Sequence, residues 1–246
     1  MKLDNKRTIL TGLAFLSICA FWQMYNSIVP LILTNTFHLN ETYSGAIMAA
    51  DNVLALFLLP LFGAISDKTH TKIGKRMPFI LFGTGLAIIL MNLLPLIDNS
   101  YAAAPTTFKT ISFVVVLGLL LVAMGTYRSP AVALMPDITP KPLRSKGNAI
   151  INLMGALGGV IYLGVAAVMY PNSKVEGLAH VNYQPLFMVV SAIMFVAIAV
   201  LFLTIKEPKL VAEQQKLEAA AAERKAKEAA EAAAAEAIQK FLTENV

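Results

Sequence analysis

Residues 63–80 read GAISDKTHTKIGKRMPFI, a short polar loop whose second half is strongly basic. Apolar runs flank this loop, over about residues 44–65 and 78–97. Each run is near the ~20 residues that a helix needs to cross ~30 Å of hydrocarbon. Lysine and arginine in short loops next to membrane spans favour the cytoplasmic side. The stretch therefore predicts two transmembrane helices joined by a cytoplasmic loop.

The apolar pattern repeats along the chain and predicts an all-α membrane protein. The runs are too long for strands, and they lack the alternation of apolar and polar residues that marks a membrane β-barrel. We expect a six-helix transmembrane bundle over residues 1–208. Its spans lie at about residues 9–33, 44–65, 78–97, 111–135, 148–170 and 184–205.

The composition changes after residue 208. Residues 209–246 are rich in Ala, Glu and Lys and contain no Gly or Pro, which is a strongly helix-forming composition. We expect this segment to be a solvated cytoplasmic linker or tail. A helix that binds a partner protein is the alternative.

The overall composition excludes several classes of protein. Hydrophobic residues make up 57% of the chain and charged residues 14%, and the mean hydropathy is +0.66. Six membrane-length runs cannot all be hidden in the core of one soluble domain. The single cysteine, Cys19, excludes a disulfide scaffold. The spans contain no pattern typical of a catalytic or metal site, so we expect no enzyme activity and no cofactor beyond a coupling proton or sodium ion.

The basic residues indicate the orientation and the surroundings. Seventeen of the 20 lysines and arginines lie on one side of the predicted spans, against only Lys109 and Lys174 on the other. We therefore expect a multi-pass protein of the plasma membrane with both termini in the cytoplasm. Because these residues alternate with spans and form no continuous patch, the expected surroundings are membrane lipid and not nucleic acid.

Two charged residues lie inside the predicted spans, Asp51 in the second and Arg128 in the fourth. Charges at membrane depth are costly and usually functional. A carboxyl group in low-dielectric surroundings can take up and release a proton, or it can bind sodium with oxygens from Asn52 or Asn26. Arg128 offers a fork of donors for hydroxyl or carboxylate groups. Direct pairing of the two charges and a shared aqueous cavity both remain open, as do an anchoring role for Asp51 and snorkelling of Arg128.

The first span carries Trp22, Gln23 and Asn26 near its middle. Trp22 and Asn26 are four residues apart and share a helix face, with Gln23 beside them. An aromatic plate with amide donors and acceptors suits a sugar, whose C–H face stacks and whose hydroxyls form hydrogen bonds. Hydrogen bonds between helices are the alternative role of the amides.

The fifth span carries Gly155, Gly158 and Gly159. The first and the last form the Gly-x-x-x-Gly pattern of closely packed membrane helices. We expect these glycines to serve the packing of helices, because the absence of a side chain lets another backbone come close.

The loop at residues 63–80 resembles the loop signature of the major facilitator superfamily, in which a glycine, an aspartate and a basic cluster join the second and third helices. Its spacing and the following Pro-Phe-Ile resemble the sugar:cation symporter branches, the glycoside–pentoside–hexuronide and sucrose:proton symporters. Residues 127–137, which read YRSPAVALMPD, are similar to the sucrose-type branch. The resemblance makes Arg128 a candidate for the substrate site.

The resemblance also implies a cytoplasmic gate. The residues of this chain that it assigns to the gate are Gly63, Asp67, Lys68, Gly74, Lys75 and Arg76, and we expect Asp137 and Arg144 to belong to the same gate. From charge alone, Asp67 could accept hydrogen bonds from a helix N-terminus, or pair with Arg144 or Lys146. Breaking such contacts would open the inward path.

The family's transporters have twelve helices in two six-helix halves, with the substrate between them. This chain matches one half and the start of a linker, so the resemblance implies a second half, from the same chain, a second copy or a separate chain. The expected function is a secondary active transporter, or its N-terminal half, that moves a sugar or similar small polar solute with a proton or sodium ion. The alternative is a truncated or regulatory six-helix membrane protein without transport activity of its own.

Overall fold

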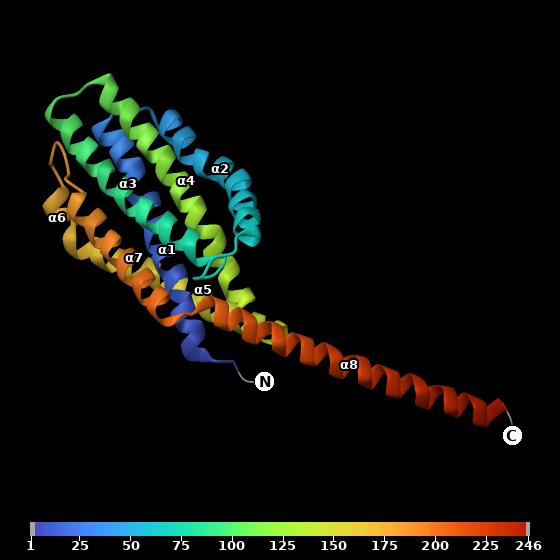
Figure 1. Cartoon of the computed structure of the whole chain (residues 1–246). Helices are drawn as coiled ribbons and strands as arrows, with labels where there is room; N and C mark the ends of the chain where they lie inside the picture. Colours follow the sequence, from blue (N-terminus) through green and yellow to red (C-terminus); the bar gives the residue numbers. More distant parts are fainter. Residues whose placement is uncertain (1–2, 245–246) are drawn as a thin grey trace.

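The computed structural model describes residues 3–244, and the side chains within them except those of Asn172 and residues 233–244. The described chain is helical and contains no strand (Figure 1). The long helices are α1 (Asn5–Leu31), α2 (Glu41–Lys68), α3 (Met77–Ala103), α4 (Thr107–Asp137), α5 (Arg144–Met169), α7 (Gln184–Thr204) and α8 (Glu207–Glu244). Shorter turns are η1 (Ile32–Thr36), η2 (Lys141–Leu143) and α6 (Asn172–Val175). Six of these helices, all except α8, are long and apolar enough to cross a membrane. This confirms the six expected spans.

The six spans form one bundle around α1, α3, α4 and α7. α1 packs on α5 and α7, and α3 packs on α4 and α7. The buried core between them includes Phe21, Phe113, Tyr127 and Phe187. α2 lies on the flank of α4; Leu54 on one side of it packs against the core, whereas Leu56 and Phe57 are exposed and face outward. In a membrane such a face contacts lipid or another helical bundle.

The N-terminus and α8 emerge from the same end of the bundle, which we call the terminal end (Figure 1). The opposite end, with the α3–α4 connection and α6, is the far end. α8 begins at Glu207, two residues before the expected tail, and its later turns extend away from the bundle. An even number of spans places both ends of the chain on one side, as the distribution of basic residues predicts.

The glycines of α5 divide between two roles. A Cβ at Gly158 would clash with the backbone of Leu16, and a Cβ at Gly155 would lie 2.9 Å from the Cys19 sulfur. These two glycines let α1 and α5 pack closely. The packing role expected for Gly159 is wrong, because a Cβ there would meet nothing within 4 Å. Gly159 instead leaves an open space beside α1.

The third span is longer than the sequence predicts. We placed its end at residue 97, but α3 continues to Ala103 and so includes Asp98, whose side chain is fully buried. α3 therefore carries a buried acidic residue, Asp98, in addition to the Asp51 carboxyl group in α2. The helix extends because residues 98–103 contain no proline or glycine to end it.

Candidate functional site

Asp51 and Arg128 line the same small cavity, of about 20 Å³, between α2 and α4. They do not form an ion pair in the described structure, which favours the shared cavity over direct pairing. A hollow of about 10–15 Å³ already holds one water molecule. The Asp51 Oδ1 atom is buried and has no hydrogen-bond partner among the described residues. Asp51 thus lines the cavity and has a carboxyl oxygen without a hydrogen-bond partner among the described residues.

Trp22 holds the Arg128 side chain. The Arg128 Cζ atom lies 5.6 Å from the centroid of the indole ring, within the range of a cation–π contact. The indole itself is fixed by edge-on contacts with two buried rings, 5.3 Å from Phe21 and 5.2 Å from Tyr25 between centroids. The guanidinium therefore stacks on an aromatic plate whose position the core determines.

A larger open groove of about 390 Å³ lies between α1 and α5. Trp22, Gln23 and Asn26 line its α1 side together with Cys19, and Gly155 and Gly159 lie on its α5 side. Hollows of roughly 300–1,000 Å³ are typical of small-molecule sites. The groove combines an aromatic ring, two amide side chains and an open glycine, which suits a ligand with both a flat apolar face and hydroxyl groups.

The structure separates the residues suggested for an ion site. Asp51 lines the small cavity, whereas Asn26 lines the groove. Asn52 is exposed and belongs to neither hollow. Neither of these two amides lines the cavity that contains Asp51.

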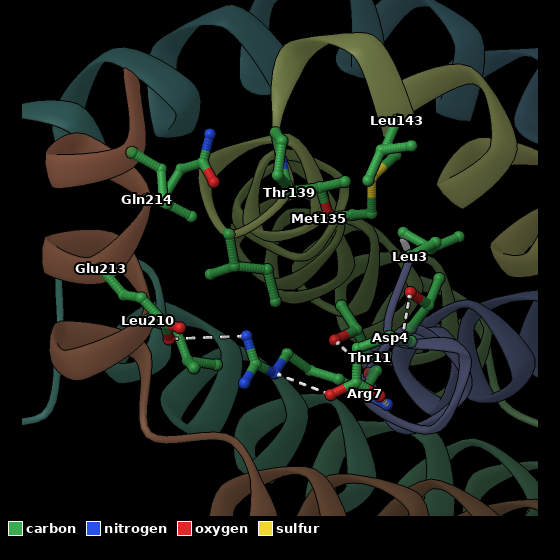
Figure 2. A pocket seen from close by; sticks show the side chains of 14 residues that line it. Leu3, Asp4, Arg7, Thr11, Met135, Thr139, Leu143, Leu210, Glu213 and Gln214 are labelled. Atoms are coloured by element: carbon green, nitrogen blue, oxygen red, sulfur yellow. Dashed lines mark hydrogen bonds and ion pairs between the residues drawn. The ribbon is translucent and has the colours of Figure 1, made fainter. Parts of the chain in front are cut away.

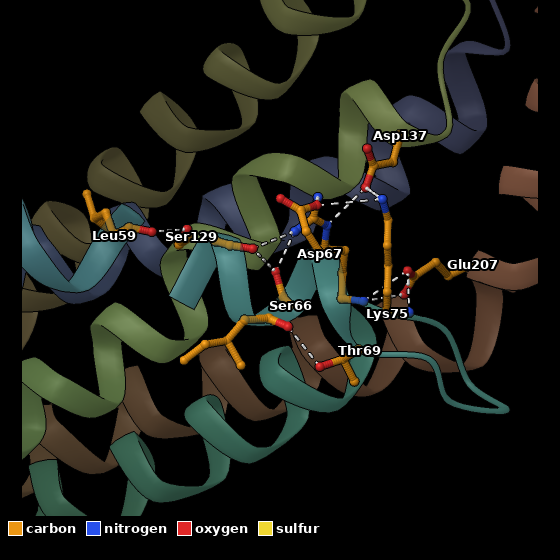
Figure 3. Close-up of polar contacts among 11 residues, drawn as sticks. Leu59, Ser66, Asp67, Thr69, Lys75, Ser129, Asp137 and Glu207 are labelled. Carbon is orange, nitrogen blue, oxygen red and sulfur yellow. Dashed lines mark hydrogen bonds and ion pairs between the residues drawn. The ribbon is translucent and has the colours of Figure 1, made fainter. Parts of the chain in front are cut away.

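At the terminal end, Asp67, Lys75, Asp137 and Glu207 lie close together (Figure 3). Arg76 contacts both aspartates and Glu207 and so lies at the centre of a polar cluster. We call this group the Arg76 cluster; its members are Ser66, Asp67, Lys75, Arg76, Asp137 and Glu207. The Arg76 side chain is only 5% exposed. Its Nε donates to Asp137 Oδ2 at 2.9 Å, and its two terminal nitrogens donate to Asp67 and Ser66. One guanidinium thus joins the end of α2, the start of α3 and the end of α4.

Lys75 adds a second positive charge to the cluster. Its Nζ lies 3.1 Å from Asp137 Oδ2 and 3.8 Å from Asp67 Oδ1. The pairing of Asp67 with Arg144 or Lys146 that charge alone suggested does not occur, because Asp67 pairs with Lys75 and Arg76. These partners are nearer along the chain, in the loop that follows α2.

Glu207, like Ser66, is a member of the cluster that sequence reasoning missed. Its buried carboxylate accepts hydrogen bonds from the backbone N–H groups of Lys75, Arg76 and Met77, at 2.8, 2.9 and 2.9 Å. It thereby caps the N-terminus of α3, where a negative charge is favoured. The helix-terminus role considered for Asp67 belongs to Glu207. An acidic residue directly after the last span, in Lys206-Glu207-Pro208, was the available signal.

Gly74 makes room for this cap. Its φ of +119° is a conformation that residues with a side chain rarely adopt, and a Cβ there would overlap the Glu207 carboxylate. Gly63 contributes its carbonyl, which lies 3.4 Å from an Arg76 nitrogen. Lys68 is exposed and makes no ion pair with the described residues.

Arg144 lies apart from the Arg76 cluster. It donates to the Thr139 carbonyl at 3.2 Å and lies 3.6 Å from Glu218 of α8. Arg7 of α1 lies similarly between Asp4 and Glu213, beside a cavity of about 270 Å³ that α1, α4 and α8 enclose (Figure 2). The expected gate therefore consists of one cluster around Arg76 and a separate contact between α5 and α8.

Asp98 forms a further polar group at the far end. Its Oδ2 lies 3.8 Å from Nε2 of His180, which also lies 2.9 Å from Asn99 Oδ1. Tyr183 lies directly before α7 and near Asp98. Burial, and secondarily the Asp98 charge, raise the pKa of the Tyr183 hydroxyl, so the tyrosine is neutral. His180 lies in the segment between α6 and α7. The contact ties that loop to the end of α3.

Comparison with known proteins assigns a family to this arrangement. The family model described as Major Facilitator Superfamily matches residues 11–245. The chain is 28% identical to the sucrose transport protein SUC3 of Arabidopsis thaliana over 160 residues, which are 59% of this chain and 26% of that protein. It is 31% identical to the sucrose transport protein SUT3 of Oryza sativa subsp. japonica over 123 residues, 44% of this chain and 24% of that protein.

A bacterial relative is named for a different solute. The alpha-ketoglutarate permease of Escherichia coli (strain K12) is 27% identical over 180 residues, 71% of this chain and 37% of that protein. The alignments with the sucrose transport proteins thus span about a quarter of each relative's length.

Proposed function

The chain belongs to the major facilitator superfamily, and on that basis we propose that it is a secondary active transporter, or the N-terminal half of one, for a sugar or similar small polar solute. Family membership and the transporter relatives identify an integral, multi-pass membrane transport protein rather than an enzyme. A proton or a sodium ion is the proposed coupling ion. Transport would proceed by alternating access, in which this bundle rocks against a second six-helix half.

The groove between α1 and α5 is the observation that carries the proposal. It places the Trp22 ring beside the amides of Gln23 and Asn26, and the open position of Gly159 leaves space opposite them. A sugar ring can stack its C–H face on the indole while the amides bind its hydroxyls. The sucrose transport proteins among the relatives support this class of solute.

Asp51 is the proposed coupling residue. It has a buried oxygen without a hydrogen-bond partner among the described residues, and it lines the same cavity as Arg128. A carboxylate in such surroundings gains from binding a proton or a cation, because it has no hydrogen bond of its own to lose. Arg128, held on Trp22, is the proposed partner for solute hydroxyl groups.

We assign the Arg76 cluster to the gate and place the terminal end in the cytoplasm of the plasma membrane. The distribution of lysine and arginine supports this orientation. In the closed state Arg76 and Lys75 hold the ends of α2 and α4 together through Asp67 and Asp137. Their separation would widen the path between the groove and the cytoplasm. The second half would cover the exposed face of α2.

Binding to the 246-residue chain in lipid nanodiscs tests the proposal. Cys19 lines the groove and Trp22 is the only tryptophan, so both are built-in reporters. We expect sucrose to slow the alkylation of Cys19 by N-ethylmaleimide and to change the fluorescence emission of Trp22. Both effects should saturate, and both should reach half of their maximum at the same sucrose concentration. α-Ketoglutarate should do neither; if only α-ketoglutarate does so, the solute is a dicarboxylate. No saturable effect of either solute would favour the alternative, a six-helix membrane protein without transport activity.

A further inference from the structure

Trp22 occupies a special position between the two hollows of the bundle. Among the described residues it is the only one that lines both the groove between α1 and α5 and the small cavity with Asp51 and Arg128. The other residues of the groove come from α1 and α5, and the other residues of the cavity come from α2 and α4. The indole therefore forms the wall between the two spaces.

The contacts of the indole hold the ring in place but would allow it to rotate. Phe21 and Tyr25 hold its edges, and both rings are 0–1% exposed. Its Nε1 atom is buried and has no hydrogen-bond partner among the described residues, so no hydrogen bond fixes the ring. A buried indole N–H usually has a partner. The ring is thus held by packing and by its contact with the Arg128 guanidinium, and a rotation that gives Nε1 a hydrogen-bond partner would be favourable.

The guanidinium of Arg128 depends on the same ring. Its Cζ lies 5.6 Å from the indole centroid, and Asp51 lines the cavity that contains it. If the indole moves, Arg128 loses its aromatic support and the nearest acid that shares its cavity is Asp51. A displacement that begins in the groove therefore changes the charge balance around Asp51 without any direct contact between solute and ion.

We propose that Trp22 is the residue that couples the solute groove to the ion cavity: a solute in the groove displaces the indole, which releases Arg128 toward Asp51. This inference rests on the proposed function of the groove. Thermodynamic linkage makes the effect reciprocal, so the state of Asp51 must also change the affinity of the groove for solute. Trp22 is a positioning residue for Asp51, in addition to any contact with the solute.

The wall can be tested without any solute. Leu121 lines the small cavity and not the groove, and it is 5% exposed. In the Leu121→Cys, Cys19→Ser chain in nanodiscs, the rate of labelling by a water-soluble methanethiosulfonate reagent measures access to the cavity. Because a closed wall opens only in minor states populated about 0.1–10% of the time, Trp22→Ala should raise this rate at least about tenfold.

Two variants control for general loosening. Trp22→Phe keeps a ring in the wall and should label slowly. Leu163→Ala enlarges the groove from α5 and leaves the wall intact, so it should also label slowly. Equal labelling rates with Trp22 and with Ala at position 22 would overturn the proposal, as would a Leu163→Ala rate as high as that of Trp22→Ala.

The coupling itself is measured in the chain that retains Cys19. The quantity measured is the sucrose concentration that gives half of the maximal protection of Cys19 from alkylation, called the midpoint. It is compared in the parent, Asp51→Asn, Trp22→Ala and doubly substituted chains. Coupling between sites typically changes affinity about 5- to 150-fold, so Asp51→Asn should shift the midpoint within that range when Trp22 is present and not when it is alanine. The same shift in both backgrounds would refute coupling through Trp22. If sucrose protects no variant, the proposed sugar site fails, while the labelling of Leu121→Cys still decides whether Trp22 is the wall.

Discussion

Arg76 donates a hydrogen bond from Nε to Oδ2 of Asp137 over 2.9 Å, which joins the start of α3 to the last residue of α4. The same guanidinium pairs with Asp67 near the end of α2. Arg76 is buried, whereas Asp67 is largely exposed and Asp137 partly so. The cluster therefore has one buried cation at its centre and acids that can separate from it into water, an arrangement suited to a contact that opens and closes.

Replacement of Arg76 tests how much this contact stabilises the terminal end. Arg76→Ala leaves Asp137 and Ser66 without their buried partner. A hydrogen bond to a charged group contributes about 1.5–3 kcal/mol, and Asp137 keeps its contact with Lys75, so we expect a moderate fall in the thermal midpoint in detergent. Lys68→Ala, which changes an exposed side chain, should leave the midpoint unchanged. Equal midpoints for the parent and Arg76→Ala would show that the cluster does not hold the bundle closed.

Gly74→Ala tests the contact between α8 and the α2–α3 loop. The new methyl group would overlap the Glu207 carboxylate, and the backbone at a φ of +119° disfavours alanine. We expect the start of α8 to detach, so that trypsin cleaves faster after Lys206 and Lys209. Glu207→Gln should act in the same direction, because it weakens three hydrogen bonds to backbone N–H groups. Glu213→Gln removes only one exposed ion pair at 3.7 Å and should leave this cleavage unchanged. Cleavage at the parent rate in Gly74→Ala would contradict the cap.

Asp51→Asn tests the coupling site in the assembled transporter. The amide cannot take up a proton or supply a negative charge to sodium, so accumulation of solute against a gradient should be lost. Exchange of labelled for unlabelled solute should continue, because the groove residues remain. Both rates are measured in the same proteoliposomes at matched protein content. Full accumulation by Asp51→Asn would mean that the coupling ion binds elsewhere.

Single-cysteine labelling tests the orientation. In a Cys19→Ser background, cysteines at Asn40 and Asn99 should react with an impermeant maleimide in intact cells, and a cysteine at Thr71 should react only after the membrane is opened. The expectation follows from the unequal distribution of basic residues between the two sides. Labelling of position 71 in intact cells would reverse the assigned sides of the membrane.

The sequence by itself determined the six spans, the common side of both termini and the family. These properties depend on local quantities, since the length and hydropathy of one run decide whether it can cross a membrane. Trp22, Gln23 and Asn26 could likewise be placed on neighbouring positions of one helix, because helical geometry relates residues three and four apart. The basic loop at residues 63–80 indicated Asp67, Lys75 and Arg76, which the structure brings together.

Only the tertiary structure decided which distant side chains meet. Glu207 caps a helix that begins about 130 residues earlier, Asp98 is buried beside His180, and Gly158 rather than Gly159 lies against α1. It also decided that Trp22 borders both hollows and that Asn52 borders neither. These outcomes depend on the rotation of each helix about its axis and on the helices that pack against it. Hydropathy does not specify either, because a lipid-facing and a core-facing side of a membrane helix are both apolar.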